Sequence, residues 1–396
     1  MPERAAVGFA PSVGAELARS IRARLEPRGN EMVDLLGELV RIESPSDDPA
    51  ALARMAAHLE ALFGEFGPIS HHATGPGGAP HLDLRIDGPP DGGRYTLVLC
   101  HYDTVWGIGT FDPSPFTVDA AGVARGPGVL DMKGGIALLR FALAELRALG
   151  RPPRRPVRVL FTCDEELRSE TSRSLIEAAA RDAAAALVLE SPLPGGTLKT
   201  ARKGSATYRI EIEGRAAHAG VEPEKGVSAI VELALQIPVI HAIADPARGT
   251  TVNVGVVHGG TRSNVVPAHA EAEVDVRAAT VAEADRVDRE LRSLAPRLPG
   301  ARVRAVPRSR KPPMERTEAI VALFQLARAI AAGMGVDLAE GATGGGSDGN
   351  LTAAAGVPTL DGLGPEGEGA HAAHEHVLVE SLPRRAALIA GLLAEA

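Results

Sequence analysis

Three short apolar runs, each ending in an acidic or histidine side chain or followed by one within two residues, indicate the fold class of this 396-residue chain. The runs are residues 95–100, 157–162 and 186–190, and each has the composition of a buried β-strand. The spacing of apolar residues predicts a helix at 131–148, between the first two runs, and another at 174–186, before the third. Strands that alternate with helices imply an α/β domain with a mostly parallel sheet and helices on both faces.

The polar residues at the ends of these runs indicate where a site would lie. His101 and Asp103 follow the first run, Glu165 and Glu166 follow the second, and Glu190 ends the third. In open α/β sheets, ligands bind at the carboxyl ends of the strands. We therefore expect these side chains to converge on one crevice.

A second pattern begins after Lys203. Period-2 alternation at 206–213, 251–257 and 270–276 predicts half-exposed antiparallel strands, and helical spacing predicts a helix at 221–240. We interpret this segment as a compact α+β unit that ends near the proline-rich, basic stretch 307–313. The predicted organisation is a larger domain formed by residues 1–202 and 311–396 and an inserted domain at 203–310.

Composition excludes several classes of protein. The net charge of −8 argues against a nucleic-acid partner, which would need a basic face. The two cysteines, Cys100 and Cys163, fall in or beside apolar runs and are expected to be reduced core thiols. No uncharged apolar stretch is long enough to span a membrane, and residues 1–25 lack the apolar core of a signal peptide, so we expect a cytoplasmic protein without a membrane partner.

Two motifs place single polar residues in distinctive settings. In His101-Tyr-Asp103, the Asp is placed to hold the second ring nitrogen of the His, as metal-bound histidines require. Asp131 stands between glycines in Gly126-Pro-Gly-Val-Leu-Asp131-Met-Lys-Gly-Gly135, which is also compatible with a simple helix N-cap. These glycines do not fit a phosphate-binding loop or a dinucleotide fingerprint.

The remaining candidates are acids and histidines near strand ends. The adjacent Glu165 and Glu166 form either a solvated loop or a divided site, in which one acid binds metal and the other takes a proton from a metal-bound water. Glu190 ends a buried run. The segment His371-Ala-Ala-His374-Glu375-His376 holds three of the 12 histidines and forms either a metal-binding tract or a solvated turn.

Together these motifs supply nitrogen and oxygen ligands from five places on one scaffold, with no thiolate. Such a set suits zinc, manganese or cobalt in a paired catalytic site. No Gly-x-Ser-x-Gly elbow is present, which argues against a serine hydrolase. The candidates are His101, Asp131, one of Glu165 and Glu166, Glu190, and one of the histidines in 371–376.

In this order and combination, the motifs resemble those of the M20 metallopeptidase family, in particular its glutamate carboxypeptidase (carboxypeptidase G2-like) branch. The resemblance runs from about residue 31 to the end of the chain. The matching segments, besides those above, are Glu190-Ser-Pro, Gly214-Arg-Ala-Ala-His218-Ala-Gly, Asn264-Val-Val-Pro, Gly344-Gly-Gly-Ser-Asp348 and Gly369-Ala-His371.

The resemblance implies a site with two metal ions, taken here as Zn²⁺ with Co²⁺ or Mn²⁺ as alternatives, bridged by Asp131. It implies that Glu165 is the general base, that Asp103 orients His101, and that a cis peptide follows Asp131. The remaining ligands are implied in pairs, His101 with Glu190 and Glu166 with His371.

The resemblance also assigns the inserted unit as a lid and dimerisation domain of a homodimer. Its His218 would reach the site of the partner subunit and stabilise the oxyanion. Asn264 and Arg277 would hold the carboxylate of the substrate, and we add Lys203, from a basic stretch, and Gly345 to the expected substrate contacts.

The implied activity is hydrolysis of an amide bond next to a free carboxylate, in a short peptide or an N-acyl amino acid. A deacylase or dipeptidase of the same family remains an alternative. An aminopeptidase would need an acid where Arg277 is expected, to bind a free amine. An inactive binding protein would have lost a ligand or the base, whereas all are present here.

Overall fold

The computed structural model describes residues 13–91, 93–111 and 113–396, and the chain divides into two compact units. Unit 1 comprises the chain up to Thr200 together with Arg316–Gly341 and Ser347–Ala396, and unit 2 comprises Ala201–Glu315 with Ala342–Gly346. The expectation of an α+β unit inserted into an α/β domain is confirmed. Residues 1–12, which are part of the segment 1–25 predicted to lack a signal peptide, lie outside the described residues.

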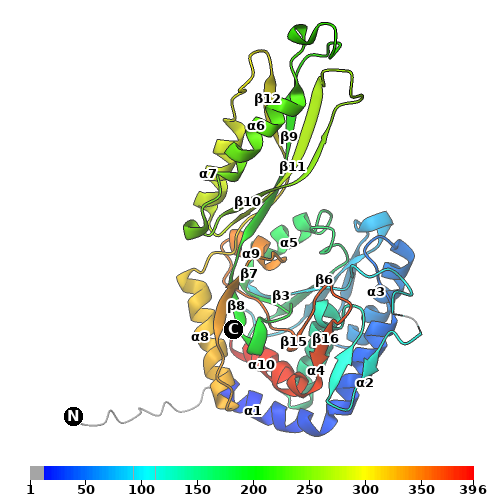
Figure 1. Cartoon of the computed structure of the whole chain (residues 1–396). Helices are drawn as coiled ribbons and strands as arrows, with labels where there is room; N and C mark the ends of the chain where they lie inside the picture. Colours follow the sequence, from blue (N-terminus) through cyan, green and yellow to red (C-terminus); the bar gives the residue numbers. More distant parts are fainter. Residues whose placement is uncertain (1–12, 92, 112) are drawn as a thin grey trace, which may run out of the picture. The chain divides into compact units, whose positions relative to one another are not determined.

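Unit 1 is built on a six-stranded sheet whose central strands are parallel (Figure 1). The first two strands in the sheet order run antiparallel to their neighbours, so the sheet is mixed but mostly parallel, as the sequence predicted. The strand order is β1 (Ile69–His72), β2 (His81–Ile86), β6 (Val157–Thr162), β3 (Tyr95–His101), β7 (Ala183–Val188) and β14 (Thr359–Leu360).

Helices cover both faces of this sheet because its central strand is apolar on both sides. In β3, Val98 and Cys100 join one hydrophobic core, whereas Leu97 and Leu99 join the other. The second core is completed by α5 (Arg173–Ala180) and α9 (Gly349–Ala354). The first core is completed by α1 (Val13–Leu25), α2 (Gly29–Arg41), α3 (Pro49–Phe63), α4 (Gly134–Ala148), α8 (Glu318–Gly333) and α10 (Leu382–Glu395).

Unit 2 is a four-stranded antiparallel sheet with two helices. Its core joins alternate residues of the strands, such as Ile210 and Ile212, to apolar residues of the helices. The strand order is β10 (Thr251–Gly259), β11 (His269–Ala278), β9 (Gly204–Glu213) and β12 (Arg302–Lys311), and the helices are α6 (Ala229–His241) and α7 (Val281–Arg292).

The edge strand β12 lies where the sequence predicted only a proline-rich end to the unit. Pro307 is accommodated at an irregularity in the pairing of β12 with β9, between Pro307 and Ser309. Proline is tolerated at such irregularities and on edge strands, because its missing N–H group can point to solvent, where no neighbouring strand needs a hydrogen-bond donor.

Two predicted helices were wrong at one end. The alanine-rich helix expected at 174–186 ends at Ala180, and β7 begins at Ala183, because pairing with β3 overrides the helical propensity of alanine. The helix expected at 221–240 begins only at Ala229, after the short turn Pro223–Lys225, where the Ser228 side chain caps it by accepting the Val231 N–H.

Two small sheets complete the described part of the chain. One of them flanks the turn that carries His371. The strands of this sheet are, in order, β15 (Gly367–Glu368), β16 (His376–Leu378), β5 (Val123–Arg125) and β4 (Thr117–Val118). The other sheet pairs β13 (Glu340–Thr343) with β8 (Leu198–Arg202). Among the described residues, no helix has both the length and the apolar character needed to cross a membrane.

Candidate metal centre

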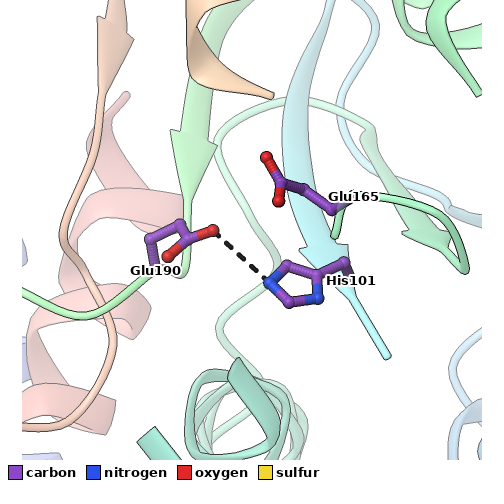
Figure 2. A group of neighbouring side chains, drawn as sticks. All are labelled: His101, Glu165 and Glu190. Atoms are coloured by element: carbon purple, nitrogen blue, oxygen red, sulfur yellow. Dashed lines mark ion pairs between the residues drawn. The ribbon is translucent and has the colours of Figure 1, made fainter. Parts of the chain in front are cut away.

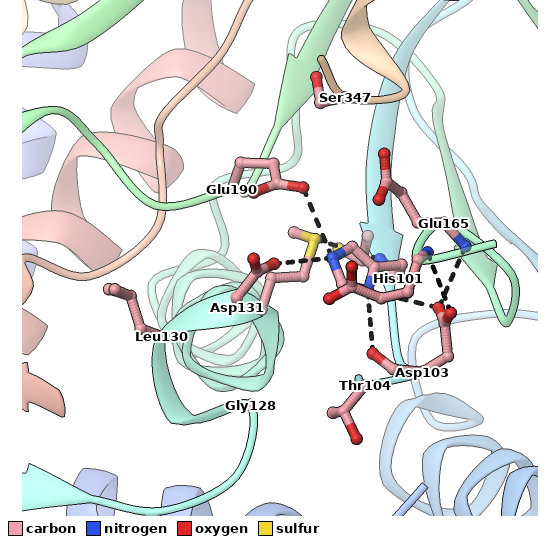
Figure 3. Close-up of polar contacts among 12 residues, drawn as sticks. His101, Asp103, Thr104, Gly128, Leu130, Asp131, Glu165, Glu190 and Ser347 are labelled. Carbon is pink, nitrogen blue, oxygen red and sulfur yellow. Dashed lines mark hydrogen bonds and ion pairs between the residues drawn. The ribbon is translucent and has the colours of Figure 1, made fainter. Parts of the chain in front are cut away.

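The five expected metal ligands come together in unit 1, at the carboxyl end of its parallel strands. Figure 3 shows His101, Asp131 and Glu190 among them. Each is carried by a strand end or by a short turn next to one. His101 is the last residue of β3, Asp131 precedes α4, Glu166 follows β6, Glu190 lies two residues beyond β7, and His371 lies in the turn between β15 and β16.

Asp131 lies between the two histidines and presents one carboxylate oxygen to each. Its Oδ1 is 2.9 Å from Nε2 of His101, and its Oδ2 is 3.3 Å from Nε2 of His371. On the first side, Glu190 Oε1 is 3.5 Å from the His101 Nε2, and on the second, Glu166 Oε1 is 3.0 Å from the His371 Nε2. The ligands therefore form two groups that share Asp131.

The backbone around Asp131 departs from the helix that the sequence predicted from this residue onward. Asp131 has non-helical angles of φ −119° and ψ 92°, it is followed by a cis peptide, and α4 begins only at Gly134. Gly135 allows α4 to approach the segment before Glu190, since a Cβ there would lie 2.1 Å from the Leu189 carbonyl oxygen. His371, with φ 63°, also holds a left-handed backbone that costs of order 1–3 kcal/mol and is typical of functional sites.

Asp103 holds both His101 and the loop of acidic residues. Nδ1 of His101 lies 3.1 Å from the Asp103 carbonyl oxygen and 3.4 Å from its carboxylate Oδ1. The same carboxylate accepts the backbone N–H groups of Glu165 and Glu166, both at 3.2 Å, and the Ser46 hydroxyl at 2.8 Å. With Nδ1 acting as the donor, Nε2 of His101 is left to face Asp131.

Glu165 adjoins the first ligand group. One potential ligand atom from each of His101, Glu165 and Glu190 lies within 4.8 Å of the others (Figure 2). A second such set is His101, Asp131 and Glu166. Glu165 is half-buried, whereas His101 and Glu190 are buried. The position of Glu165 therefore suits either a metal ligand or a base next to the metal ligands.

The electrostatics of the cluster favour bound positive charge. Burial raises the pKa of Glu166 to about 7. Hydrogen bonds with Asp131 and Glu166 raise the pKa of His371 to about 10. Burial lowers the pKa of His101, but its contacts with Asp103, Asp131 and Glu190 outweigh this and raise it well above the ordinary value. Divalent cations would neutralise these converging carboxylates, and the donor set of imidazoles and carboxylates fits them.

The other expected site residues belong to unit 2. His218 is exposed, and its segment pairs with that of Asn264: Ala219 donates its N–H to the Asn264 carbonyl at 3.0 Å. Arg277, on β11, donates to both carboxylate oxygens of Asp275 at 3.0 and 3.2 Å. Lys203 donates its backbone N–H to Thr343, within the short segment that also contains Gly345.

Sequence reasoning overlooked two polar residues close to the candidate site in the fold. Ser46 is not among the predicted site residues, yet its hydroxyl donates to the Asp103 carboxylate. Asp348, which lies in a family motif without an assigned role, accepts the Ser169 hydroxyl and lies 3.4 Å from that of Thr162. The sequence signal for Asp348 is an acid that follows three glycines and a serine, at the start of a helix.

An α/β sheet that gathers two histidines and two further carboxylates around one shared carboxylate, with an inserted α+β unit, defines a class of metallohydrolases with paired metal ions. The chain belongs to the peptidase family M20/M25/M40, whose model matches residues 97–395. It is 32% identical to carboxypeptidase G2 of Pseudomonas sp. (strain RS-16) in an alignment of 369 residues that covers 91% of this chain and 88% of that protein.

Solved structures share the fold. Aminopeptidase PepT from Bacillus cereus aligns with a TM-score of 0.72 at 24% identity, covering 93% of this chain and 98% of that one. The Bacillus subtilis protein YXEP, described as a dinuclear metal-binding peptidase from the M20 family, aligns with a TM-score of 0.67 at 18% identity, covering 95% and 98%. At these identities the likeness establishes the fold.

Proposed function

We propose that this chain is a two-zinc hydrolase that cleaves an amide bond next to a free carboxylate, in a peptide or an N-acyl amino acid. The observation that carries this proposal is the position of Asp131, whose two carboxylate oxygens each lie beside a different histidine. The name of the relative carboxypeptidase G2, at 32% identity, supports a carboxypeptidase-like activity. Zinc suits the donor set, and cobalt or manganese would bind the same atoms.

The chain's own residues then divide the work. His101, Asp131, Glu166, Glu190 and His371 would hold two divalent ions, which would supply a water molecule of lowered pKa and polarise the scissile carbonyl. Glu165 takes the proton from the attacking water and passes it to the leaving nitrogen. The Asp103 carboxylate fixes the backbone of Glu165 at 3.2 Å, which keeps this base beside the ligand group of His101.

Unit 2 would recognise the substrate. Arg277 presents a planar fork of donors that suits a carboxylate, and a substrate carboxylate would compete with Asp275 for it. We propose Asn264, Lys203 and Gly345 as further contacts, and His218 as the donor to the oxyanion. Arg277 is a cation that favours a substrate carboxylate, whereas its partner Asp275 is the acid that a free amine could meet, and the substrate panel separates the two.

We propose that the protein forms a homodimer through unit 2. The two edge strands of its sheet differ in charge: β12 carries several arginines, whereas β10 contains no lysine, arginine, aspartate or glutamate. Strand β10 also exposes Val256 and Val257. Next to the end of β10, helix α6 exposes Ile230 and Val231. An uncharged edge beside apolar side chains favours pairing with a second copy, while a basic edge opposes it.

A substrate panel tests the proposal. The zinc-loaded protein should hydrolyse an N-acyl glutamate or a dipeptide with a free carboxylate, and a chelator should abolish the activity. The matched control is the same compound with its carboxylate converted to an amide, which should be a poor substrate. Preferential cleavage of amidated compounds that carry a free amine would instead indicate an aminopeptidase. Acyl-Glu and acyl-Arg substrates then separate a glutamate carboxypeptidase from other deacylases.

A further inference from the structure

Glu375 is a buried acid that none of the roles above uses. Its side chain is 1% exposed, and it lies just before β16. Its Oε1 accepts the backbone N–H groups of Leu130 at 2.9 Å and Asp131 at 3.1 Å. Its Oε2 accepts the Gly128 N–H at 3.2 Å and the Trp106 indole N–H at 2.9 Å. One carboxylate thus receives four donors.

These donors come mainly from the turn that carries Asp131. Gly128 is left-handed at φ 69°, and Asp131 is not helical, so the N–H groups of this turn cannot all find partners within a helix. A buried N–H without an acceptor costs free energy comparable to a lost hydrogen bond. Glu375 supplies the missing acceptors, including one for the N–H of Asp131 itself, and so fixes the backbone of the shared ligand.

The short segment that carries Glu375, between β15 and β16, also carries His371. Ala372 donates its N–H to the Gly369 carbonyl and Glu375 donates its N–H to the Ala372 carbonyl, both at 2.8 Å, so His371 and Glu375 lie in two consecutive hydrogen-bonded turns. His371 Nε2 lies 3.3 Å from the Asp131 carboxylate, while Glu375 holds the Asp131 backbone. The side chain of Asp131 and its main chain are therefore both fastened to residues 371–375.

We propose that Glu375 is a positioning residue that sets the spacing between His371 and Asp131, and hence the affinity of the site for its second metal ion. This inference rests on the proposed two-metal function. A carboxylate is required because it only accepts hydrogen bonds. In an amide side chain, one of the two oxygens is replaced by an NH₂ group, which would face two N–H donors and accept from neither.

The test is Glu375→Gln, with Glu380→Gln as the matched control. Glu380 is exposed, lies five residues further along the same segment and undergoes the same change of charge. We expect Glu375→Gln to bind its second zinc ion about 10–100-fold more weakly, as is usual when a residue that supports a metal ligand is lost. The control should bind two ions as the unchanged protein does. Zinc affinity is measured by competition with a chromophoric chelator.

Thermal unfolding of the metal-free proteins separates positioning from general support. If Glu375→Gln lowers the melting temperature without zinc but keeps normal zinc affinity, Glu375 is only a structural acceptor and the inference is wrong. If the unchanged protein itself fails to bind two ions, the proposed function fails first.

Two further variants keep the inference testable if Glu375→Gln does not fold. Glu375→Asp keeps the acceptors but shortens the reach, and it should weaken zinc binding to an intermediate degree. Trp106→Phe removes a single donor and leaves the three backbone donors, so it should weaken zinc binding less than Glu375→Asp does. The reverse order of these two effects would overturn the inference.

Discussion

The two units of this protein hold their candidate residues in opposite ways. In unit 1, His101, Asp103 and Glu190 are buried, His371 is exposed, and each of the four contacts another site residue. In unit 2, His218 and Asn264 are exposed, on loops beside the sheet. Buried, mutually bonded groups are held in one geometry by their neighbours, whereas exposed groups act only once something binds them.

This contrast suggests a division between chemistry and recognition. Metal ligands must keep their positions to within a few tenths of an ångström, so a rigid sheet with a bonded second layer suits them. Residues that contact a substrate or a second subunit must first be accessible. Substitutions in unit 1 should therefore change metal content or the chemical step, and those in unit 2 should change substrate binding or cooperation between subunits.

The largest effect is expected for Asp131→Asn. The variant places an NH₂ group where one of the two carboxylate oxygens faces a histidine, so it cannot serve both ligand groups. We expect loss of the paired metals and of detectable hydrolysis. Elemental analysis of the purified protein measures the metal content. Two tightly bound ions in the variant would show that Asp131 is not the shared ligand.

The next effect is expected for Glu165→Gln. If Glu165 is the proton shuttle and not a ligand, the variant keeps two metal ions and loses about 10²–10⁴-fold in kcat. Metal content and turnover are measured on the same preparation, with Asp131→Asn for comparison. Loss of one ion would make Glu165 a ligand of the group it forms with His101 and Glu190. Near-normal turnover would remove it from the mechanism.

A smaller effect is expected for His218→Ala, and it tests unit 2. Loss of one donor to an oxyanion typically lowers kcat by about 10²–10³-fold. Because His218 is proposed to serve the partner subunit, mixing this variant with Glu165→Gln should restore activity when subunits exchange. About half of the dimers would be mixed, each with one competent site, so recovery should reach about a quarter of normal activity.

The control for this experiment is each variant exchanged with itself, which should show no recovery. Sedimentation of the unmixed proteins reports whether they are dimers. A fully active monomer, or exchanged mixtures without recovery, would mean that His218 acts within its own chain or not at all.

The smallest effect is expected for His374→Ala. His374 is exposed and lies three residues after His371 on the same turn. Because His371 is the histidine whose Nε2 approaches Asp131 and Glu166, the change at His374 should leave two metal ions bound and turnover nearly unchanged. His371→Ala is the matched comparison and should lose metal. If the two variants behave the other way round, the wrong histidine has been assigned.

Local pattern was enough to predict the sheet and its central strands. Apolar runs that end in acids are recognisable without any tertiary contact, because a strand buried on both faces must be apolar throughout. The prediction failed where pairing decides against local preference. The alanines of β7 favour a helix by themselves, and β12 contains a proline and many arginines, yet both pair with neighbouring strands.

The sequence by itself determined the set of chemical groups: the order of the motifs, the family, and which acids and histidines stand at strand ends. Only the tertiary structure decided which atoms meet. His371 lies 205 positions from Glu166, and Glu375 lies 244 positions from Asp131. No periodicity links residues so far apart, and the side of Asp131 that each histidine faces depends on how the turns pack at the end of the sheet. A pattern of residues can thus name the ligands, but the pairing of their atoms follows from packing.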